Sequence, residues 1–387
     1  MKKWVAVLWM LFVLCAVSPA LAEPAPNLSK KCTYKQSGGG NIENLHNGNY
    51  VNTFRTNEKV GAYVEVRLPK GQVSQGIYIH FGEMTADFLV QVQINDKWQT
   101  VYEGTPAFAN QFVALEDAAS FRIATKGKEK ERLSLVELLV YGAGELPSDI
   151  QMWEPTPEKA DLLVLVAHPD DEYIFMGGAI PYYAAEKGKS TVVCYMTCGN
   201  RLRLHEMLKG LWAAGYRQYP VVAHFRDRYS MGVTEGFKYW DREETISYIA
   251  DLYKTYCPDV VLTHDLEGEY GHGNHCTTAY GAVEAVNRAA EGGFELKKLY
   301  LHLYPENQIY LDWTVPLESF GGKRAIDVAA EAFKMHVSQQ GGYAYVNRKK
   351  FVFAAEIGGP FDNGLFGLYH STVGEDVLKN DAFENID

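Results

Sequence analysis

Hydrophobic and polar positions alternate along the first part of the chain with the two-residue period of half-buried β-strands. Residues 63–68 and 88–94 follow this pattern closely. Further β-rich runs, separated by turn residues such as those at 95–97, cover residues 76–81, 98–102 and 135–141. No convincing helix stands out here. Many short strands joined by turns predict an all-β sandwich over residues 23–145.

The pattern changes after residue 160. Residues 146–160 carry Pro147, Pro155 and Pro157 and are interpreted as a linker. The continuous apolar run at 161–167 then predicts a strand buried on both faces. The next predicted strands are 190–197, 221–225 and 260–263, and the predicted helices are 177–188, 202–214, 243–256 and 276–290. This alternation predicts an α/β fold with a parallel sheet and helices on both faces.

This α/β domain is expected to occupy residues 161–387. The aromatic-rich stretch at 351–369 is interpreted as strands of a C-terminal extension. We find no internal repeat and no low-complexity segment.

The first residues have the layout of a secretory signal peptide. Two lysines precede an apolar run at 4–17, and residues 20–22 read Ala-Leu-Ala, a small-x-small cleavage site. A membrane anchor is the alternative, but it needs about 20 apolar residues, and Ser18 and Pro19 end the run. We therefore expect cleavage after Ala22 and a secreted, periplasmic or cell-surface protein.

The composition limits the kinds of binding partner that we expect. Apolar residues make up 47% and charged residues 22%, as in an ordinary globular protein. The formal net charge is −11, and −13 without the two N-terminal lysines, so nucleic acid is not expected as a partner. No stretch after residue 22 reads as a membrane span of the mature chain. The five remaining cysteines allow one bridge but no disulfide framework, and the lack of a CxxC pair argues against a cysteine-rich zinc site.

Two polar clusters follow predicted strands of the α/β part. The first is Ala-His-Pro-Asp-Asp-Glu at 167–172, and the second is Gly-His-Gly-Asn-His at 271–275. Ligands of open parallel sheets bind beyond the carboxyl ends of the strands, so the fold would bring the clusters together.

These residue types suit a catalytic zinc site, which uses three His or carboxylate ligands and leaves one position for water. His168 and Asp171 can point at one metal from a tight turn, and His275 would complete the trio. Asp170 is then the candidate base, and His272 the candidate group that stabilises an oxyanion or protonates the leaving amine. A single loop histidine is more often a hydrogen-bonding residue, and paired carboxylates often only cap a helix. The presence of both clusters at strand ends favours the functional interpretation.

The α/β part resembles the PIG-L family of zinc-dependent de-N-acetylases, from about residue 161 to 340. The matching motifs are residues 167–172, Pro-Asp-Val-Val-Leu-Thr-His-Asp at 258–265, Tyr-Gly-His-Gly-Asn-His at 270–275, and His-Val-Ser-Gln at 336–339. The resemblance implies a Rossmann-like fold and hydrolysis of the acetamide of N-acetylglucosamine units.

Carried onto this sequence, the family pattern implies particular roles. The zinc ligands would be His168, Asp171 and His275, the general base Asp170, and the helper of the oxyanion and leaving group His272.

Other positions have less specific roles. Arg203 and Glu206 resemble the family's Arg-x-x-Glu element, whose arginine binds sugar hydroxyls. Tyr270 matches a position near the substrate carbonyl, with simple packing as the alternative. Asp227 follows a predicted strand and is interpreted as reaching the substrate, with a surface salt bridge as the alternative.

One departure concerns the second cluster, where the family commonly has His-Pro-Asp-His. This chain has Gly273 and Asn274 between the two histidines. Metal binding is not threatened, but the missing aspartate affects how His272 is oriented and charged.

The N-terminal part resembles discoidin-like, galactose-binding jelly rolls, on the segments 44–53 and 133–142. Such domains often bind carbohydrate, and a purely structural sandwich is the alternative.

The leading hypothesis is therefore a secreted zinc deacetylase of N-acetylated sugars or glycans. The alternatives are a carbohydrate-binding protein without activity and a zinc amidase acting on a non-sugar amide. The sequence leaves the particular glycan, the physiological metal and the oligomeric state open.

Overall fold

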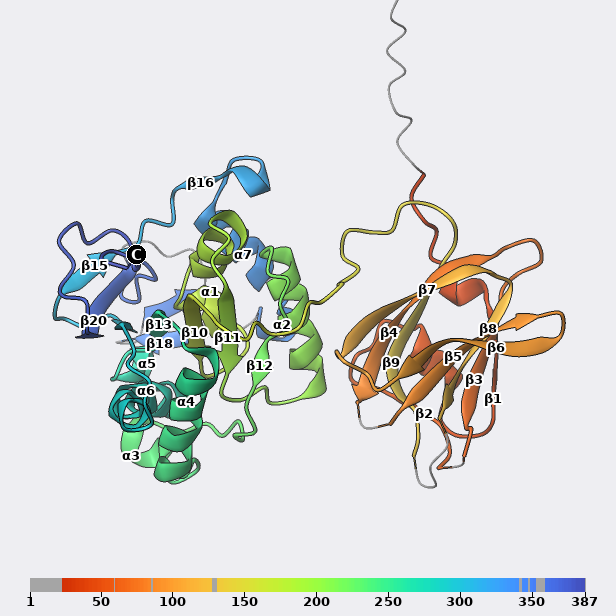
Figure 1. Cartoon of the computed structure of the whole chain (residues 1–387), viewed down its shortest axis with the longest axis horizontal. Coiled ribbons are helices and arrows are strands. Elements are labelled where there is room, and N and C mark those ends of the chain that lie inside the picture. Colours follow the sequence, from red (N-terminus) through yellow and green to blue (C-terminus); the bar gives the residue numbers. More distant parts are fainter. Residues whose placement is uncertain are drawn as a thin grey trace, which may run out of the picture.

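The structure is a computed structural model that describes residues 23–386, except residues 59, 85, 127–130, 341–342, 347–348 and 353–358. The predicted signal peptide at 1–22 lies outside the described residues. Figure 1 shows an all-β lobe followed along the chain by an α/β lobe. The predicted fold class is therefore confirmed.

Two antiparallel sheets form the all-β lobe. One has the order β1 (Thr33–Gln36), β3 (Tyr63–Arg67), β8 (Ser120–Thr125), β5 (Phe88–Ile94) and β6 (Lys97–Gly104). The other has the order β2 (Phe54–Arg55), β9 (Ser134–Tyr141), β4 (Ser74–Glu83) and β7 (Asn110–Ala118), and the 3-10 turns η1 (Ser29–Lys31) and η2 (Ile42–Leu45) lie near the start of the chain. Alternate residues such as Val90 and Val92 of β5 are buried in the core between the sheets, because successive side chains of a strand point to opposite faces.

A seven-stranded sheet forms the centre of the α/β lobe. Its order is β12 (Val221–Val222), β11 (Thr191–Tyr195), β10 (Leu162–Val166), β13 (Val260–Thr263), β14 (Lys298–His302), β20 (Leu365–Ser371) and β15 (Gln308–Tyr310). The first five are parallel, and β20 pairs antiparallel with both β14 and β15. The part of the predicted C-terminal extension that forms β20 therefore lies inside the central sheet. Residues 353–358 of that predicted extension are outside the described residues.

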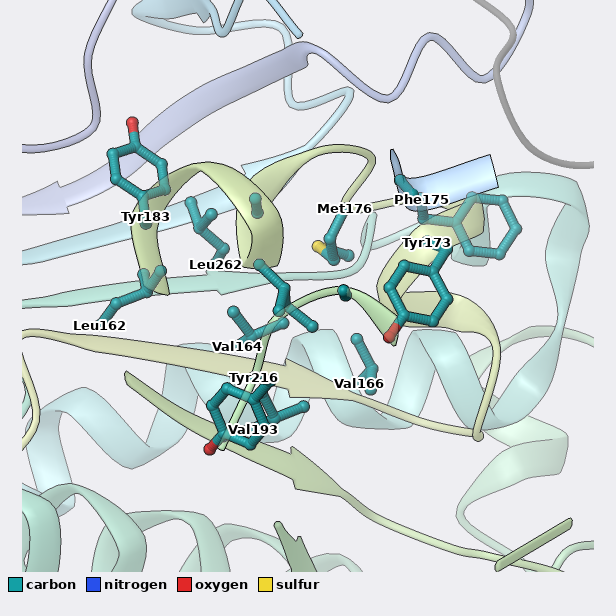
Figure 2. Close-up of a cluster of buried hydrophobic side chains, with 14 of the residues drawn as sticks. Leu162, Val164, Val166, Tyr173, Phe175, Met176, Tyr183, Val193, Tyr216 and Leu262 are labelled. Carbon is teal, nitrogen blue, oxygen red and sulfur yellow. The ribbon is translucent and has the colours of Figure 1, made fainter. Parts of the chain in front are cut away.

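Helices cover both faces of this sheet. One face carries α1 (Asp171–Ile174), the π-helical η3 (Ile180–Glu186), α2 (Arg201–Ala213) and α7 (Ala325–Phe333), and the other carries α4 (Arg242–Tyr256) and α6 (Gly273–Glu291). Strand β10 is apolar on both faces of the sheet, so both faces must be buried. Leu162, Val164 and Val166 pack on the first face, as Figure 2 shows. Leu163 and Leu165 pack on the second face.

Short elements complete the lobe. They are α3 (Gly232–Gly236), α5 (Gly268–Gly271), η4 (Glu318–Phe320), η5 (Val337–Gln339), and the paired strands β16 (Pro316–Leu317) with β17 (Lys323–Arg324) and β18 (Tyr343–Val346) with β19 (Lys349–Val352). Within the described part of the chain, no helix is both long enough and apolar enough to cross a bilayer.

The two lobes contact each other through α2 and the segment that follows it. Arg201 Nε donates to the carbonyl oxygen of Gly82 at 3.2 Å, and the Ala109 amide donates to Tyr219 Oη at 3.1 Å. The buried rings of His80 and His205 are stacked with centroids 5.5 Å apart.

Candidate metal and catalytic site

The two polar clusters meet at the carboxyl ends of the parallel strands β10 and β13. His168 and Asp170 follow β10, and Asp171 begins α1. His272 is the N-cap of α6, and His275 lies in the first turn of that helix rather than on a loop, because α6 begins three residues before the predicted start. Both clusters are buried. They therefore meet where the strand-end rule places them.

Three donor atoms lie close enough together to share one ion. His168 Nδ1 is 3.1 Å from Asp171 Oδ2, His275 Nε2 is 3.4 Å from the same oxygen, and the two ring nitrogens are 3.3 Å apart. Tetrahedral ligands at zinc distances are separated by about 3.3 Å. The three atoms therefore fit a zinc ion. Two overlapping groups of potential ligands surround this position, His168 with His272 and His275, and Asp171 with His264 and His275.

A buried carboxylate, Glu269, orients His275. Its Oε2 accepts from His275 Nδ1 at 2.6 Å, which leaves the lone pair of His275 Nε2 free for a metal. Its Oε1 lies 3.0 Å from His264 Nδ1 and 3.1 Å from His302 Nδ1. The Ala167 amide donates to His264 Nε2 at 3.0 Å, and Asp171 Oδ2 lies 3.3 Å from the same nitrogen. Glu269 thus holds together histidines from three segments.

The backbone at Glu269 is strained in the position that directs this side chain. Its φ is 55° and its ψ is −78°, inside the short helix α5. Such a conformation is costly for a residue with a Cβ and persists where surrounding contacts enforce it, often at functional sites.

Asp170 is held beside the donor triangle by Arg203. The guanidinium Nη2 is 3.1 Å from Asp170 Oδ1, and Nη1 is 3.3 Å from Asp227 Oδ2. Asp170 has a φ of 118°, and its amide donates to Glu172 Oε2 at 2.7 Å. Asp227 Oδ1 is 3.6 Å from His168 Nε2. Asp170, Arg203 and Asp227 therefore form one side of the site.

Asn274 contacts both neighbouring histidines. Its amide N–H donates to His272 Nδ1 at 3.2 Å, so a neutral His272 carries its proton on Nε2 and can donate from there. Its side-chain Nδ2 lies 3.0 Å from His168 Nε2, and its Oδ1 has no hydrogen-bond partner among the described residues. The side-chain amide of Asn274 can be rotated by 180°, because its oxygen and nitrogen have nearly equal size. In that orientation Oδ1 accepts a hydrogen bond from His168 Nε2–H, and His168 Nδ1 is free as a ligand atom. Asn274 thus fixes His272 through its backbone and faces His168 with its side chain.

Burial and neighbouring charges shift the pKa values of the site. Burial raises the pKa of Asp170 to about 8, although Arg203 opposes the shift. Burial also acts to raise the pKa of Asp171, but His275 and His168 outweigh it and hold that pKa well below its usual range. Burial, with the neighbouring His275 and His168, lowers the pKa of His272 to about 2. The lowered pKa favours the neutral ring of His272, which can still donate a hydrogen bond from Nε2.

The remaining predicted residues lie around this centre. The ring of Tyr270 packs against His275, with centroids 5.6 Å apart, and against His272, at 5.7 Å. Glu206 does not face the metal ligands, and its Oε1 accepts from the Ser338 amide at 2.7 Å. In the Arg-x-x-Glu element, Arg203 therefore contacts Asp170, the candidate base. Glu206 contacts Ser338, in the His-Val-Ser-Gln segment at 336–339.

The sequence analysis did not assign roles to His264, Glu269 or His302. His264 follows β13, and His302 ends β14, the next strand of the sheet, so the strand-end rule that selected His168 applies to both. No pattern identifies Glu269, because the direction of its side chain depends on the unusual backbone of α5.

Part of the α/β lobe is similar to a known protein family. Residues 163–286 match the family model described as PIG-L: GlcNAc-PI de-N-acetylase. The matched segment includes both polar clusters.

Among curated relatives, the 1D-myo-inositol 2-acetamido-2-deoxy-alpha-D-glucopyranoside deacetylase of Salinispora arenicola is 29% identical over 38% of this chain and 56% of its own length. The protein of the same name from Mycolicibacterium smegmatis is 30% identical over 37% of this chain and 59% of its own. The matches span 56% to 64% of the first three relatives.

Two solved structures are similar to parts of this chain. The conserved protein TT1542 from Thermus thermophilus matches 47% of this chain and 81% of its own, at 22% identity and a TM-score of 0.37. The family 32 CBM from C. perfringens NanJ, solved with galactose, matches 30% of this chain and 98% of its own, at 17% identity and a TM-score of 0.26.

Proposed function

We propose that this chain is a metal-dependent hydrolase, with zinc as the metal, that removes the acetyl group from N-acetylglucosamine-type sugars. The observation that carries the proposal is the triangle of donor atoms from His168, Asp171 and His275, with Asp170 beside it, within the segment that matches the PIG-L family model. The names of the relatives, deacetylases of a 2-acetamido-2-deoxy-glucopyranoside, support a sugar acetamide as the target.

The residues have complementary roles in amide hydrolysis. His168, Asp171 and His275 would hold a divalent ion, which would supply a nucleophilic water at neutral pH and polarise the amide carbonyl. In its carboxylate form, which the positive charge of Arg203 favours against the effect of burial, Asp170 takes a proton from the attacking water as the carbon–oxygen bond forms. His272 Nε2–H donates a hydrogen bond to the carbonyl oxygen as its negative charge develops. The carbon–nitrogen bond then breaks, and the proton on Asp170 passes to the departing sugar amine, which leaves acetate.

Arg203 positions the base. Its two hydrogen-bonding nitrogens hold Asp170 and Asp227, so the carboxylate of Asp170 is fixed in direction. Tyr270 and Asp227 are the further substrate-binding residues of this proposal, on either side of the histidines.

The proposal is tested by substituting the base without removing a ligand. We expect Asp170→Ala to bind one zinc per chain, as the unmodified protein does, and to lose nearly all acetate release from N-acetylglucosamine substrates. Metal content is measured by atomic emission and acetate by a coupled assay. Unchanged turnover in Asp170→Ala would refute the base assignment, and failure of the unmodified protein to retain zinc would refute the metal assignment.

We also propose export of the protein with cleavage after Ala22. The support is the charged start, apolar run and Ala-Leu-Ala of residues 1–22. N-terminal sequencing of the protein recovered outside the cytoplasm is expected to begin at Glu23. A chain that keeps its N-terminal methionine there would contradict the proposal.

A further inference from the structure

A groove of about 710 Å³ lies beside the proposed catalytic centre. Most of its lining comes from the segment after β11, residues 197–200, and from β12 with the residues on either side of it, 219–220 and 222–228; Leu204 of α2 adds to it. None of the three proposed metal ligands lines it. Asp227 connects the two places, because it lines the groove and also lies against Arg203 and His168.

The all-β lobe supplies part of the wall. Met84, from the loop after β4, lines the groove and is 38% exposed. Two residues before Met84, the carbonyl oxygen of Gly82 in β4 accepts a hydrogen bond from Arg201 Nε of α2. Gly82 has no room for a side chain, since a Cβ there would lie 2.7 Å from Ser134 Oγ and from Thr53 Cγ2. The segment of the all-β lobe that contacts α2 therefore also forms part of the groove wall.

The lining has the chemistry of a sugar site. Tyr219 is half-buried and offers an aromatic surface, and the buried Phe225 adds a second ring to the wall. Arg226 and Arg228 are exposed and make no ion pair in the described part of the chain, so their donors are available to hydroxyl groups. Small-molecule sites combine apolar and aromatic walls with a few placed polar groups in this way, and typically enclose about 300–1,000 Å³.

We propose that this groove binds a second sugar unit, joined to the sugar whose acetamide lies at the catalytic centre. The inference rests on the proposed function and narrows it to oligosaccharides. A single sugar with its acetamide at the metal ligands leaves the groove unfilled, whereas a linked unit passing Asp227 enters it. The all-β lobe then acts in substrate choice through Met84.

Chain length is the direct test. The zinc-loaded protein is assayed for acetate release from N-acetylglucosamine and from its linked oligomers of two to four units. We expect kcat/KM to rise at least tenfold from the monomer to the dimer or trimer. Values for all oligomers within twofold of the monomer overturn the groove proposal and leave the deacetylase proposal intact. Absence of acetate release from every substrate overturns both.

Variants of groove residues test whether this groove causes the preference for linked sugars. Met84→Ala and Arg228→Ala are expected to lower kcat/KM for the trimer at least threefold more than for the monomer. Met152→Ala is the matched control, since Met152 is 54% exposed and does not line the groove. The ratio of kcat/KM for the trimer to kcat/KM for the monomer could be the same in both groove variants as in the unmodified protein. That result would show that the second sugar binds elsewhere.

Discussion

Replacing Glu269 by glutamine tests whether one buried carboxylate organises the proposed metal ligands. The carboxylate accepts from ring nitrogens of His275, His264 and His302, at 2.6, 3.0 and 3.1 Å. Glutamine has nearly the same shape but only one acceptor oxygen, and its amide group can only donate. At least one ring N–H therefore loses its acceptor inside a site where the Glu269 side chain has no solvent exposure.

The size of the effect follows from these contacts. A buried donor left without an acceptor costs roughly 1–3 kcal/mol. Loss of the carboxylate that orients a metal-ligating histidine typically lowers metal affinity by roughly 10–100-fold. We therefore expect Glu269→Gln to raise the Kd for zinc by roughly 10–100-fold, because His275 is no longer held with Nε2 towards the metal.

The assay is a titration of metal-free protein with zinc against a competing chelator of known affinity. Glu267→Gln is the matched control: the same substitution, two residues away, at an exposed position of the same segment. It is expected to bind zinc as the unmodified protein does. A Kd for Glu269→Gln within twofold of the control would refute the assigned role, and near-ultraviolet circular dichroism of both variants checks that the fold is retained.

Three further predictions concern catalysis, pH and stability. Arg203→Gln releases Asp170 and is expected to lower kcat for acetate release about 100-fold, with zinc content unchanged; normal turnover contradicts the positioning role. Burial lowers the pKa of His205 to about 3. Folding therefore favours its neutral ring, and the stability this residue contributes is lost as the pH falls below 6.5, by about 2 kcal/mol at pH 5. Urea unfolding at pH 7 and pH 5 should show that extra loss in the unmodified protein but not in His205→Phe. Asp376→Asn leaves the buried ammonium of Lys298 without its carboxylate and is expected to reduce the free energy of unfolding by about 3–5 kcal/mol; a loss below about 1 kcal/mol argues against the pair.

The sequence was sufficient for the elements whose pattern is local. The buried run of β10 and the alternation of β5 follow from side-chain periodicity alone, and the structure confirms both as strands. The position of His168 and Asp171 follows as well, since they come directly after a buried strand.

Features that depend on distant partners could not be predicted in the same way. Strand β20 lies between β14 and β15, although a long stretch of chain separates it from both, and periodicity does not specify a strand's neighbour. The role of Glu269 depends on a positive φ that the sequence does not indicate. His302 reaches the same carboxylate only because β14 is parallel to β13.

At His275, a feature set by the local sequence and a feature set by distant contacts act together. Its Nε2 faces His168 and Asp171, which the sequence identifies, and its Nδ1 faces Glu269, which only the structure reveals. A histidine can bind metal through one ring nitrogen only if the other nitrogen carries the proton. The local motif therefore supplies the proposed ligand atoms, and the pairing of strands β13 and β14 around Glu269 favours the tautomer of His275 in which Nε2 is free for a metal.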